Sequence, residues 1–318
     1  MLKVSVVIPF KDYNQIFLNN LLALNYQEFR DFEVIIVDNS FKLKDILKQE
    51  NITEKLNYEL RVLNGDGSSR ASARNIGILY SKNDIVLFLD ADMLAHKNLI
   101  KEHIMIYEKY KTKNIAVIGL ELRINDLSIL KDFNDYLNFI NNIYLNYPKS
   151  RLKLKQRKIS WYKFLTGNLS SFKENFIKTG LFDRNFKTYG FEDLELGYRF
   201  YKLGLNLIFN PISVCYHLHP LNFKNRTKNK IESVKNLKLF YQKYQNPNIL
   251  RILGINLFSK ILYKSIPQTL INQIEKKLEN YYFGNYHLIN NESRYIKFIE
   301  DIYVNYHFYN SFEKFEKT

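Results

Sequence analysis

The first half of the chain alternates short apolar runs with longer segments of helical spacing. The apolar runs are rich in β-branched and aromatic residues, which is typical of strands buried on both faces. They occupy residues 3–10, 32–38, 58–63, 85–89 and 115–120. Between them, apolar positions recur every three to four residues, as in amphipathic helices, at residues 14–26, 41–55, 70–80 and 98–110. Strands that alternate with helices predict a mostly parallel, right-handed α/β sheet flanked by helices.

The pattern changes near residue 221. Before that point, residues 206–210 and 212–215 are short strand candidates. The acids at positions 192 and 193 favour a helix that begins there, because carboxylates stabilise a helix N-terminus. From residue 221 to the end, Lys, Tyr, Leu and Ile dominate at helical spacing. We therefore expect an α/β domain over residues 1–220 and a helical C-terminal region over residues 221–318.

The composition is that of a folded protein with a large core, since 46% of the 318 residues are apolar and 15% are aromatic. The single cysteine, Cys215, excludes an intramolecular disulfide and fits a reducing compartment. Residues 1–9 already have the pattern of a strand, so we expect no signal peptide. Polar residues interrupt the apolar segment 249–266, so we expect no transmembrane helix there. These features predict a cytoplasmic protein, with peripheral contact at the inner face of the membrane as a further expectation.

The net charge of +15 predicts an anionic partner, unless it reflects only a general enrichment in lysine. Charge alone leaves the partner open among nucleotide, polysaccharide, nucleic acid and membrane surface. Nucleic acid is not expected, because the sequence contains no motif that reads it. Six cations without an intervening acid fall in residues 149–158. This basic run is either a solvated loop or a lid over an anionic ligand.

Two carboxylates, Asp90 and Asp92, directly follow the strand predicted over residues 85–89. Residues two apart in an extended chain point to the same side, so both can aim at one point beyond the sheet edge. Open α/β sheets bind ligands at this edge, outside the carboxyl ends of their strands. Hard oxygen donors suit Mg²⁺ or Mn²⁺, with a phosphorylated ligand completing the coordination. The pair therefore predicts a metal and phosphate site; the alternative is an Asp pair in a solvated loop.

Six short motifs resemble, in order, those of family 2 glycosyltransferases of the GT-A fold. They are Val-Ile-Pro-Phe at 7–10, Val-Asp-Asn-Ser at 37–40, Ala-Arg-Asn-Ile-Gly at 73–77, Leu-Asp-Ala-Asp at 89–92, Thr-Gly-Asn at 166–168 and Gly-Phe-Glu-Asp-Leu-Glu-Leu at 190–196. Within the family the chain is most similar to bacterial chondroitin-polymerase-like domains, over residues 3–220. Each motif alone is weak, but six in this order are specific. The resemblance implies a Rossmann-like sheet that binds a nucleotide-diphosphate sugar.

For the metal site, the resemblance implies that Asp92 is a direct ligand and that Asp90 contacts both ribose and metal. The late histidine of the family pattern falls on His217. His219 is the alternative, because a slip of two residues would exchange them. The ion would be Mn²⁺ or Mg²⁺, which acts as a Lewis acid on the leaving diphosphate. Either histidine otherwise has a structural role at the end of a strand.

For the donor, the resemblance implies a UDP-sugar bound along the same edge of the sheet. Asp38 would accept from the base or ribose, and Arg74 would lie beside the diphosphate. Asp66, in the loop before the helix at 70–80, would reach the base. Where the family often has Asp-Asp-Gly-Ser or Asp-Gly-Ser, this chain has Asp-Asn-Ser at 38–40, so its base contacts can differ. The other implied donor-site residues are Pro9, Phe10, Asp90, Ala91, Gly167 and Asn168.

For the acceptor, the resemblance implies that Asp193 is the general base and that Glu192 holds a sugar or acceptor hydroxyl. An inverting transfer needs a carboxylate to take the proton from the attacking hydroxyl. Adjacent acids also occur at helix starts for electrostatic reasons alone. The family's Trp-Gly-Gly-Glu-Asp has become Tyr-Gly-Phe-Glu-Asp at 189–193, so the identity of the donor sugar is not carried over. Trp161 is either a core residue or a platform for a sugar ring.

These observations predict an inverting, metal-dependent glycosyltransferase of the hexosyltransferase type. It would move a sugar from a UDP-sugar to a glycan, lipid-linked or peptide acceptor, in bacterial cell-surface polysaccharide or glycoconjugate synthesis. The alternative is an inactive protein of the same fold that binds sugar nucleotide or polysaccharide without turnover.

Overall fold

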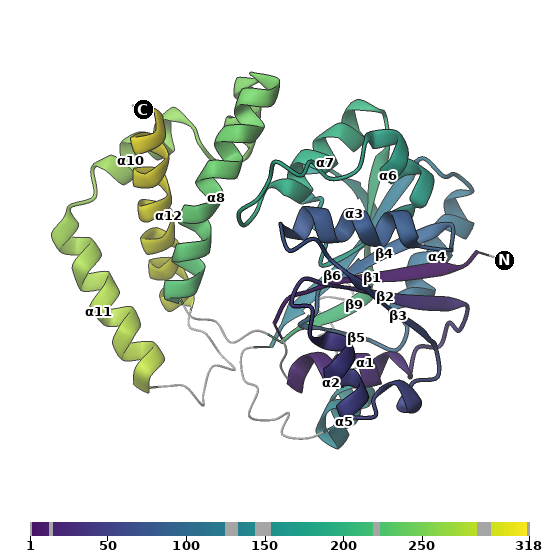
Figure 1. Cartoon of the computed structure of the whole chain (residues 1–318). Coiled ribbons are helices and arrows are strands. Elements are labelled where there is room, and N and C mark those ends of the chain that lie inside the picture. Colours follow the sequence, from purple (N-terminus) through teal and green to yellow (C-terminus); the bar gives the residue numbers. More distant parts are fainter. Residues whose placement is uncertain are drawn as a thin grey trace. The chain divides into compact units, whose positions relative to one another are not determined.

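A computed structural model describes residues 2–12, 15–124, 133–143, 154–218, 223–284 and 294–316. The chain divides into two compact units (Figure 1). The first comprises residues 1–124, 129–187 and 192–219, and the second comprises residues 125–128, 188–191 and 220–318. The second unit thus includes a short segment, 188–191, that directly precedes Glu192.

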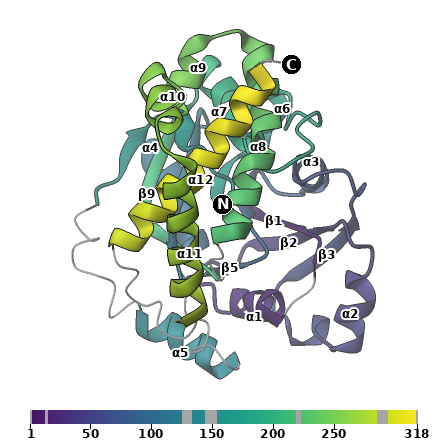
Figure 2. The same cartoon turned by 90° about the vertical axis from the view of Figure 1, so that its left-hand side faces the viewer.

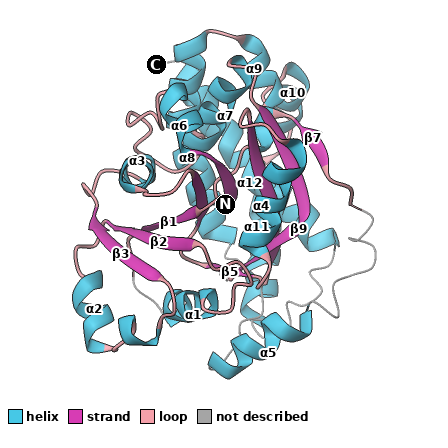
Figure 3. Cartoon of the chain, turned by 90° about the vertical axis from the view of Figure 1, so that its right-hand side faces the viewer, coloured by secondary structure: helices cyan, strands magenta, loops and turns pink. Residues whose placement is uncertain are grey.

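A mixed sheet forms the centre of the first unit (Figure 3). Its strands are β1 (Val4–Phe10), β2 (Phe32–Asp38), β3 (Glu59–Asn64), β4 (Ile85–Leu89), β5 (Met93–Ala95), β6 (Ile115–Arg123), β7 (Arg157–Ile159), β8 (Asn168–Phe172) and β9 (Asn206–His217). Their order is β3-β2-β1-β4-β8-β6-β9-β5, and β7 pairs with residues 207–209 of β9. The strands predicted from the apolar runs are all present.

Strand directions differ between the two halves of the sheet. Strands β3, β2, β1 and β4 are parallel, as predicted. In the other half, β8 is antiparallel to both β4 and β6, while β6 and β9 are parallel. The two strands expected at 206–210 and 212–215 form the single strand β9. Its register against β6 shifts between Ile118 and Leu120, an irregularity that lets one long strand bend.

Helices cover both faces of this sheet (Figure 1). The helices described in this unit are α1 (Gln15–Leu24), α2 (Leu43–Gln49), α3 (Arg70–Tyr80), α4 (Leu99–Tyr110), α5 (Phe133–Ile143), α6 (Lys173–Thr179) and α7 (Glu192–Lys202). Apolar residues of α1, α2 and α4 pack on one face, and those of α3, α6 and α7 pack on the other. The helix predicted over 41–55 ends earlier, at Gln49. Asn51 there adopts a left-handed backbone with φ of 49°, and a short 3₁₀ turn (Thr53–Lys55) follows.

Helix α3 carries the Ala-Arg-Asn-Ile-Gly motif onto the sheet. Ser69 caps its N-terminus, where the Ser69 Oγ accepts from the backbone N–H of Ser72 at 3.1 Å. Gly77 lies so close to β1 that a Cβ atom would come within 2.2 Å of Val7 Cγ1. Because residues three apart share a helix face, this close contact also fixes Arg74 on the buried side of α3.

The C-terminal part of the chain is helical where the structure describes it, as predicted (Figure 2). Its helices are α8 (Phe223–Tyr244), α9 (Pro247–Ile252), α10 (Leu257–Lys264), α11 (Gln268–Gly284) and α12 (Arg294–Glu316). Buried residues of α8, α11 and α12, among them Phe223, Leu278 and Tyr303, form its core. Within the described ranges, no helix combines the length and hydrophobicity needed to cross a bilayer.

Helix α8 makes polar contacts to two other parts of this second unit. Arg226 of α8 donates to Glu300 and Asp301 of α12, at 2.8 and 2.7 Å. The Nδ2 of Asn236, also on α8, donates to the carbonyls of Thr188 and Gly190, at 2.9 and 2.7 Å. The second contact ties the segment 188–191 to α8.

Candidate active site

Asp92 and His217 meet at the edge of the sheet. Asp90 and Asp92 follow β4, and the next residue, Met93, pairs with His217 where β5 joins β9. The Nε2 of His217 lies 3.1 Å from Oδ2 of Asp92. Burial lowers the pKa of His217, but the hydrogen bond and charge of Asp92 outweigh it and raise that pKa above its usual value. The fold therefore brings two of the predicted metal-site residues together.

The side chains at this edge fit a divalent ion only with the help of a bound ligand. Within the described part of the chain, no group of three or more His, Cys, Asp or Glu side chains is arranged to hold a metal. Asp92 and His217 offer a carboxylate oxygen and an imidazole nitrogen, and Asp90 precedes Asp92 by two residues. Such a set suits Mn²⁺ or Mg²⁺ when a diphosphate supplies the remaining oxygens. His219, the alternative ligand, lies outside the described residues.

A buried guanidinium joins Asp90 to Glu192. Arg74 donates from Nη1 to Glu192 Oε1 and from Nη2 to Asp90 Oδ1, both at 3.0 Å. Arg74 and Glu192 are buried, whereas the Asp90 side chain is 31% exposed. Charge-assisted hydrogen bonds are strong in a buried site, so Arg74 holds the end of β4 against the start of α7. In the described structure Glu192 Oε2 has no hydrogen-bond partner, which leaves it able to accept from a bound hydroxyl.

Asp193 lies beside this ion pair, in the first turn of α7. Its Oδ1 accepts from the backbone N–H of Leu194 at 2.8 Å. Burial and the neighbouring Glu192 carboxylate raise the pKa of Asp193 to about 8, against a lowering by Arg74. A carboxylate with a raised pKa is a stronger base than an ordinary aspartate. This suits the removal of a proton from a hydroxyl group.

The loops after β2 and β3 are each built around an aspartate. Asp38 accepts from the N–H and Oγ of Ser40, at 2.7 and 2.6 Å, and from the N–H of Leu43 at 2.8 Å. Asp66 accepts from the Oγ of Ser72, a hydrogen bond that lowers the pKa of Asp66 to about 2. Both carboxylates therefore have local structural partners. Their predicted contacts with a base or ribose stay predictions.

Asn39 connects these two loops. Its Oδ1 accepts from the N–H of Gly67 at 3.2 Å, and the carbonyl of Asp38 accepts from the N–H of Gly65 at 2.8 Å. A Cβ atom at Gly65 would lie 1.8 Å from Asn39 Oδ1, so the close approach requires glycine. The residue that departs from the family pattern thus forms its own link to the loop after β3.

Three of the implied donor-site residues, Pro9, Phe10 and Ala91, are engaged by the surrounding structure. Pro9 lies in β1, paired with β2. The Phe10 ring is buried, with its centre 4.4 Å from that of Phe17. The carbonyl of Ala91 accepts from Asn20 Nδ2 at 3.0 Å. Because the Phe10 ring packs in the core, only the backbone of Phe10 is available to contact a ligand.

Gly167 and Asn168 lie where β8 begins, beside Glu121 of β6. A Cβ atom at Gly167 would come within 2.5 Å of Glu121 Oε1. Asn168 is fully buried; its Oδ1 lies 2.8 Å from His103 Nε2, and its Nδ2 donates to the carbonyl of Ser213 at 3.1 Å. Burial lowers the pKa of His103 to about 4, so this histidine is neutral near pH 7. Asn168 therefore supports the sheet beneath the site.

Two polar residues of the site were not among those predicted. The negative charge of Glu121 contributes to the raised pKa of His217. Its signal is present in the sequence, because Glu121 follows the apolar run at 115–120 as Asp90 follows the run at 85–89. Asn75 exchanges two hydrogen bonds of 2.8 Å with the backbone of Phe182, which holds a loop near Arg74. The sequence signal for Asn75 is its position directly after Arg74 in the Ala-Arg-Asn-Ile-Gly motif.

Trp161 is a core residue in this structure. It is 8% exposed, and its ring contacts that of Tyr198 edge to face at 5.2 Å. Of the basic run, the cations at 149, 151 and 153 lie outside the described residues, whereas Arg157 and Lys158 form part of β7. The choice between a lid and a solvated loop is therefore open for the first part of the run.

The sequence profile of glycosyl transferase family 2 matches residues 5–173. The chain belongs to this family. A second profile, the N-terminal domain of galactosyltransferase, matches residues 148–221 of this glycosyltransferase. The two profiles together cover the strands and helices that carry the site.

Several curated relatives are similar over most of this glycosyltransferase. It is 27% identical to the uncharacterized glycosyltransferase YfnE of Bacillus subtilis, over 88% of this chain and 79% of that protein. An amylovoran biosynthesis glycosyltransferase of Erwinia amylovora is 26% identical, over 78% of this chain and 79% of that protein. Chondroitin synthase of Pasteurella multocida is 26% identical over 75% of this chain. The match spans 27% of that synthase, so this chain corresponds to about a quarter of its length.

Solved structures show the fold. A mannosyltransferase from Pyrobaculum calidifontis, solved with GDP-Man and Mn²⁺, has a TM-score of 0.58 and 15% identity, over 98% of this chain and 88% of that chain. TarS of S. aureus has a TM-score of 0.51 and 14% identity, over 98% of this chain and 55% of that chain. The predicted GT-A fold, with its helix-flanked sheet and helical C-terminal region, is confirmed.

Proposed function

We propose that this glycosyltransferase moves a hexosyl group from a UDP-sugar to a hydroxyl of a glycan, lipid-linked or peptide acceptor, with inversion. The cluster in which Arg74 joins Asp90 to Glu192, next to Asp193, carries the proposal. It combines an edge suited to a diphosphate with a carboxylate suited to act as a base. The similarity to chondroitin synthase and to the amylovoran biosynthesis enzyme supports a role in bacterial cell-surface polysaccharide or glycoconjugate synthesis.

On the donor side, the base and ribose would bind to the loops after β1, β2 and β3. The diphosphate would lie near Arg74, whose cationic fork matches phosphate oxygens. A divalent ion, Mn²⁺ or Mg²⁺, held by Asp92, His217 and Asp90 would neutralise negative charge on the leaving diphosphate. Other residues assigned to donor binding are Pro9, Phe10, Asp38, Asp66, Ala91, Gly167 and Asn168.

On the acceptor side, Asp193 would take the proton of the attacking hydroxyl. The new bond to the anomeric carbon forms while the bond from that carbon to the diphosphate breaks, and the proton passes from Asp193 to solvent. Burial and Glu192 raise the pKa of Asp193, so its carboxylate, once ionised, is a stronger base than an ordinary aspartate. Glu192, fixed through one oxygen by Arg74, would accept a hydrogen bond from a sugar hydroxyl with Oε2. These roles stay proposals.

We further propose that the protein lies in the cytoplasm, in peripheral contact with the inner face of the membrane. The net charge of +15 supports it, because that face carries anionic lipids.

The test is a screen for release of nucleoside diphosphate by the full chain. UDP-sugars and GDP-mannose are supplied one at a time with Mn²⁺, with Mg²⁺ or with EDTA. We expect UDP release from at least one UDP-sugar, loss of release in EDTA and recovery when Mn²⁺ is added back. Release from GDP-mannose alone would overturn the choice of donor. Tight UDP binding without turnover of any donor would indicate the inactive binding protein instead.

A further inference from the structure

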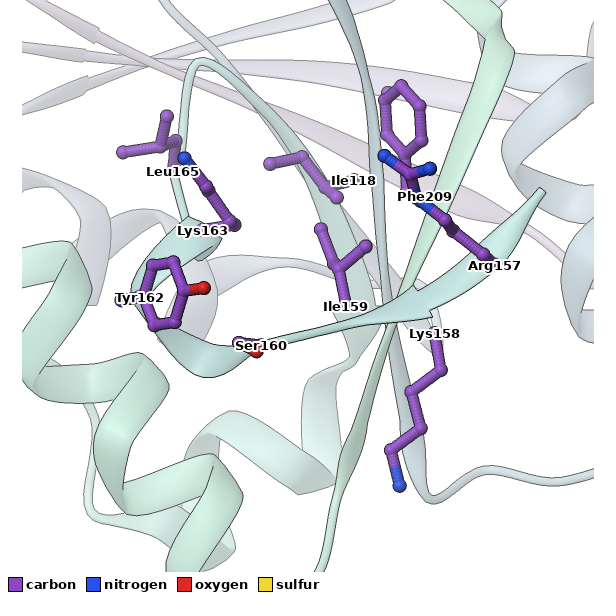
Figure 4. A pocket seen from close by; sticks show the side chains of 10 residues that line it. Ile118, Arg157, Lys158, Ile159, Ser160, Tyr162, Lys163, Leu165 and Phe209 are labelled. Atoms are coloured by element: carbon purple, nitrogen blue, oxygen red, sulfur yellow. The ribbon is translucent and has the colours of Figure 1, made fainter. Parts of the chain in front are cut away.

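A pocket of about 460 Å³ lies between β6, β7, β9 and the turn at Trp161–Lys163 (Figure 4). The roles assigned above do not use it. Its apolar lining includes Ile118, Ile159, Leu165 and Phe209. Among the residues that the structure describes, its polar lining comprises Ser160, Tyr162 and the cations Arg157, Lys158 and Lys163, and includes no acidic side chain. Its volume falls within the range of small-ligand sites, and its lining combines apolar and polar side chains.

The cations of this pocket do not all face the same way. Arg157 and Ile159 are two residues apart on β7, so their side chains share one side of the strand. In Figure 4, Lys158 extends away from the other lining side chains. Lys163 lies on the opposite rim, with its Nζ 5.6 Å from the centre of the Tyr162 ring. Among the described residues, no carboxylate pairs with Arg157 or Lys163.

The strand register connects this pocket to the proposed reaction centre. Consecutive partners across β4, β8, β6, β9 and β7 are Phe88, Leu169, Ile118, Phe209 and Arg157. Phe88 precedes Asp90 by two residues. Since neighbouring strands lie about 4.8 Å apart, the pocket extends over roughly 10 to 19 Å from β4. An oligosaccharide chain with one end at the reaction centre would span this distance.

The pocket also lies on the same face of the sheet as the proposed base. Phe88, Leu169 and Ile118 belong to the core beneath α3, α6 and α7. Phe164, at the end of the turn, packs against α7, where a Cβ atom at Gly197 would come within 2.4 Å of Phe164 Cβ. Gly197 lies about one helical turn after Asp193. The turn that borders the pocket is therefore supported by the helix that carries the base.

We infer that this pocket binds a carboxylate- or phosphate-bearing unit of an anionic acceptor glycan, a few units away from the reacting hydroxyl. The inference rests on the proposed function. Arg157 can bind either anion with two parallel hydrogen bonds, and Lys163 adds a second positive charge. The exposed Tyr162 ring offers an apolar surface to a sugar ring.

The experiment compares three tetramers as ligands of the full chain: tetragalacturonate, a glycerol-phosphate tetramer and neutral maltotetraose. Binding is measured by calorimetry at low and high salt, without a donor. We expect at least one anionic tetramer to bind more tightly than maltotetraose, and more weakly at high salt. Whichever anionic tetramer binds more tightly identifies the acceptor as uronate-bearing or phosphate-bearing.

Variants separate the pocket from general positive charge. Arg157→Gln and Lys163→Gln should each weaken anionic binding roughly ten-fold. The matched control Lys158→Gln removes the same charge from the same strand but from a side chain that extends away, so binding should stay near wild type. Equal effects of Arg157→Gln and Lys158→Gln, or equal binding of all three tetramers, would overturn the inference. UDP binding, measured in parallel, should not change; its absence in the wild type would instead count against the proposed function.

A second inference concerns α10. Leu257, Phe258, Ile261 and Leu262 are 74%, 76%, 60% and 43% exposed. Their spacing places them on one side of the helix. The other side packs on α12, where the ring of Tyr263 stacks on that of Tyr309 at 4.6 Å and Lys264 pairs with Glu313 at 2.7 Å. A capping box formed by Asn256 and Ser259 fixes the start of α10.

Charge indicates what covers this apolar side. Residues 233–274 contain no Asp or Glu, and six cations: Lys235, Lys238, Lys243, Arg251, Lys260 and Lys264. Large apolar side chains on one side of a helix, within a basic segment, are typical of helices that lie in the plane of an anionic membrane surface. We propose that α10 inserts Leu257, Phe258 and Ile261 into the headgroup region of an anionic bilayer.

The test is flotation of the full chain with vesicles of phosphatidylcholine alone or mixed with phosphatidylglycerol. We expect binding that requires phosphatidylglycerol and that falls on the order of 100-fold in the variant Leu257→Asn/Phe258→Ser/Ile261→Asn. The control Phe298→Ser removes an exposed aromatic from α12 and should bind as the wild type does. UDP release without vesicles, unchanged in both variants, shows that they are folded. Equal binding of both variants would refute the inference, and so would a dimer that the triple variant abolishes, since a second copy would then cover this side.

Discussion

Asp193→Asn tests the proposed catalytic base directly. Asparagine keeps the size and polarity of the side chain but cannot accept the acceptor proton. If Asp193 is the base, kcat should fall on the order of 10²–10⁴-fold, with UDP affinity nearly unchanged. Wild-type kcat should also rise with pH as the pH passes about 8, where Asp193 loses its proton. The variant should lose this rise.

Asp193→Asn should raise the stability of the folded protein, although it lowers kcat. Burial and Glu192 raise the pKa of Asp193 from 3.8 to about 8, so the folded state holds a proton that the unfolded state releases. Wild-type stability therefore falls as pH rises between these two values, at a rate on the order of 1 kcal/mol per pH unit. Asp193→Asn has no such proton. It should be more stable than the wild type, by a margin that widens from pH 5 to pH 8.

Two measurements decide the matter. Urea unfolding at pH 5 and pH 8 gives the difference in stability between variant and wild type. Single-turnover transfer, measured beside equilibrium UDP binding, gives the difference in the rate of transfer at known UDP affinity. Normal transfer by Asp193→Asn together with failure of Glu192→Gln would exchange the roles of the two carboxylates. A stability difference that does not change with pH would show that the pKa of Asp193 is not raised in the folded state.

Three further changes test the framework around the base. Arg74→Met leaves Glu192 buried without its cation and should cost about 3–5 kcal/mol of unfolding free energy by urea titration, because a buried ion pair loses one partner; a cost below 1 kcal/mol would mean that the ion pair is not formed. Asp92→Asn should abolish the Mn²⁺-dependent rise in melting temperature that UDP produces, while the melting temperature of the free protein should not fall. A retained rise would mean that the ion binds elsewhere. Gly77→Ala forces a methyl group against Val7 and should destabilise by about 1–3 kcal/mol in thermal unfolding, whereas a neutral result would show that α3 can shift.

The fold was largely predictable because its strands are buried on both faces. Such strands, β1, β2, β4 and β6, appear in the sequence as continuous apolar runs, and the helices between them repeat with a clear period. Strand direction in the second half was not predictable. Which strand pairs with β8, and in which sense, depends on contacts between residues far apart in sequence. The short strands β5 and β7, with three residues each, are too brief to give a pattern.

Residues of the candidate site could be selected from the sequence where an acid follows an apolar run, as at Asp90, and where a motif resembled the family. The ion pair between Arg74 and Glu192 could not be predicted, because the two residues are far apart in sequence and only the packing of α3 and α7 on the same face brings them together. The local hydrogen bonds of Asp38 and Asp66 could not be predicted from the sequence either. A carboxylate that shapes its own loop and one that binds a ligand have the same appearance in a sequence.

The hydrogen bonds from Asn236 to the carbonyls of Thr188 and Gly190 affect how far the C-terminus of this enzyme can be truncated. The C-terminal helices contain no catalytic motif, so an engineer seeking a minimal enzyme would end the chain near residue 220. That truncation removes α8, and with it the amide that fixes two carbonyls of the segment ending just before Glu192. The shortened protein would keep every proposed catalytic residue but lose the anchor of the segment that enters α7. The C-terminal helices thus contain none of the proposed catalytic residues, but α8 fixes the segment that directly precedes two of them.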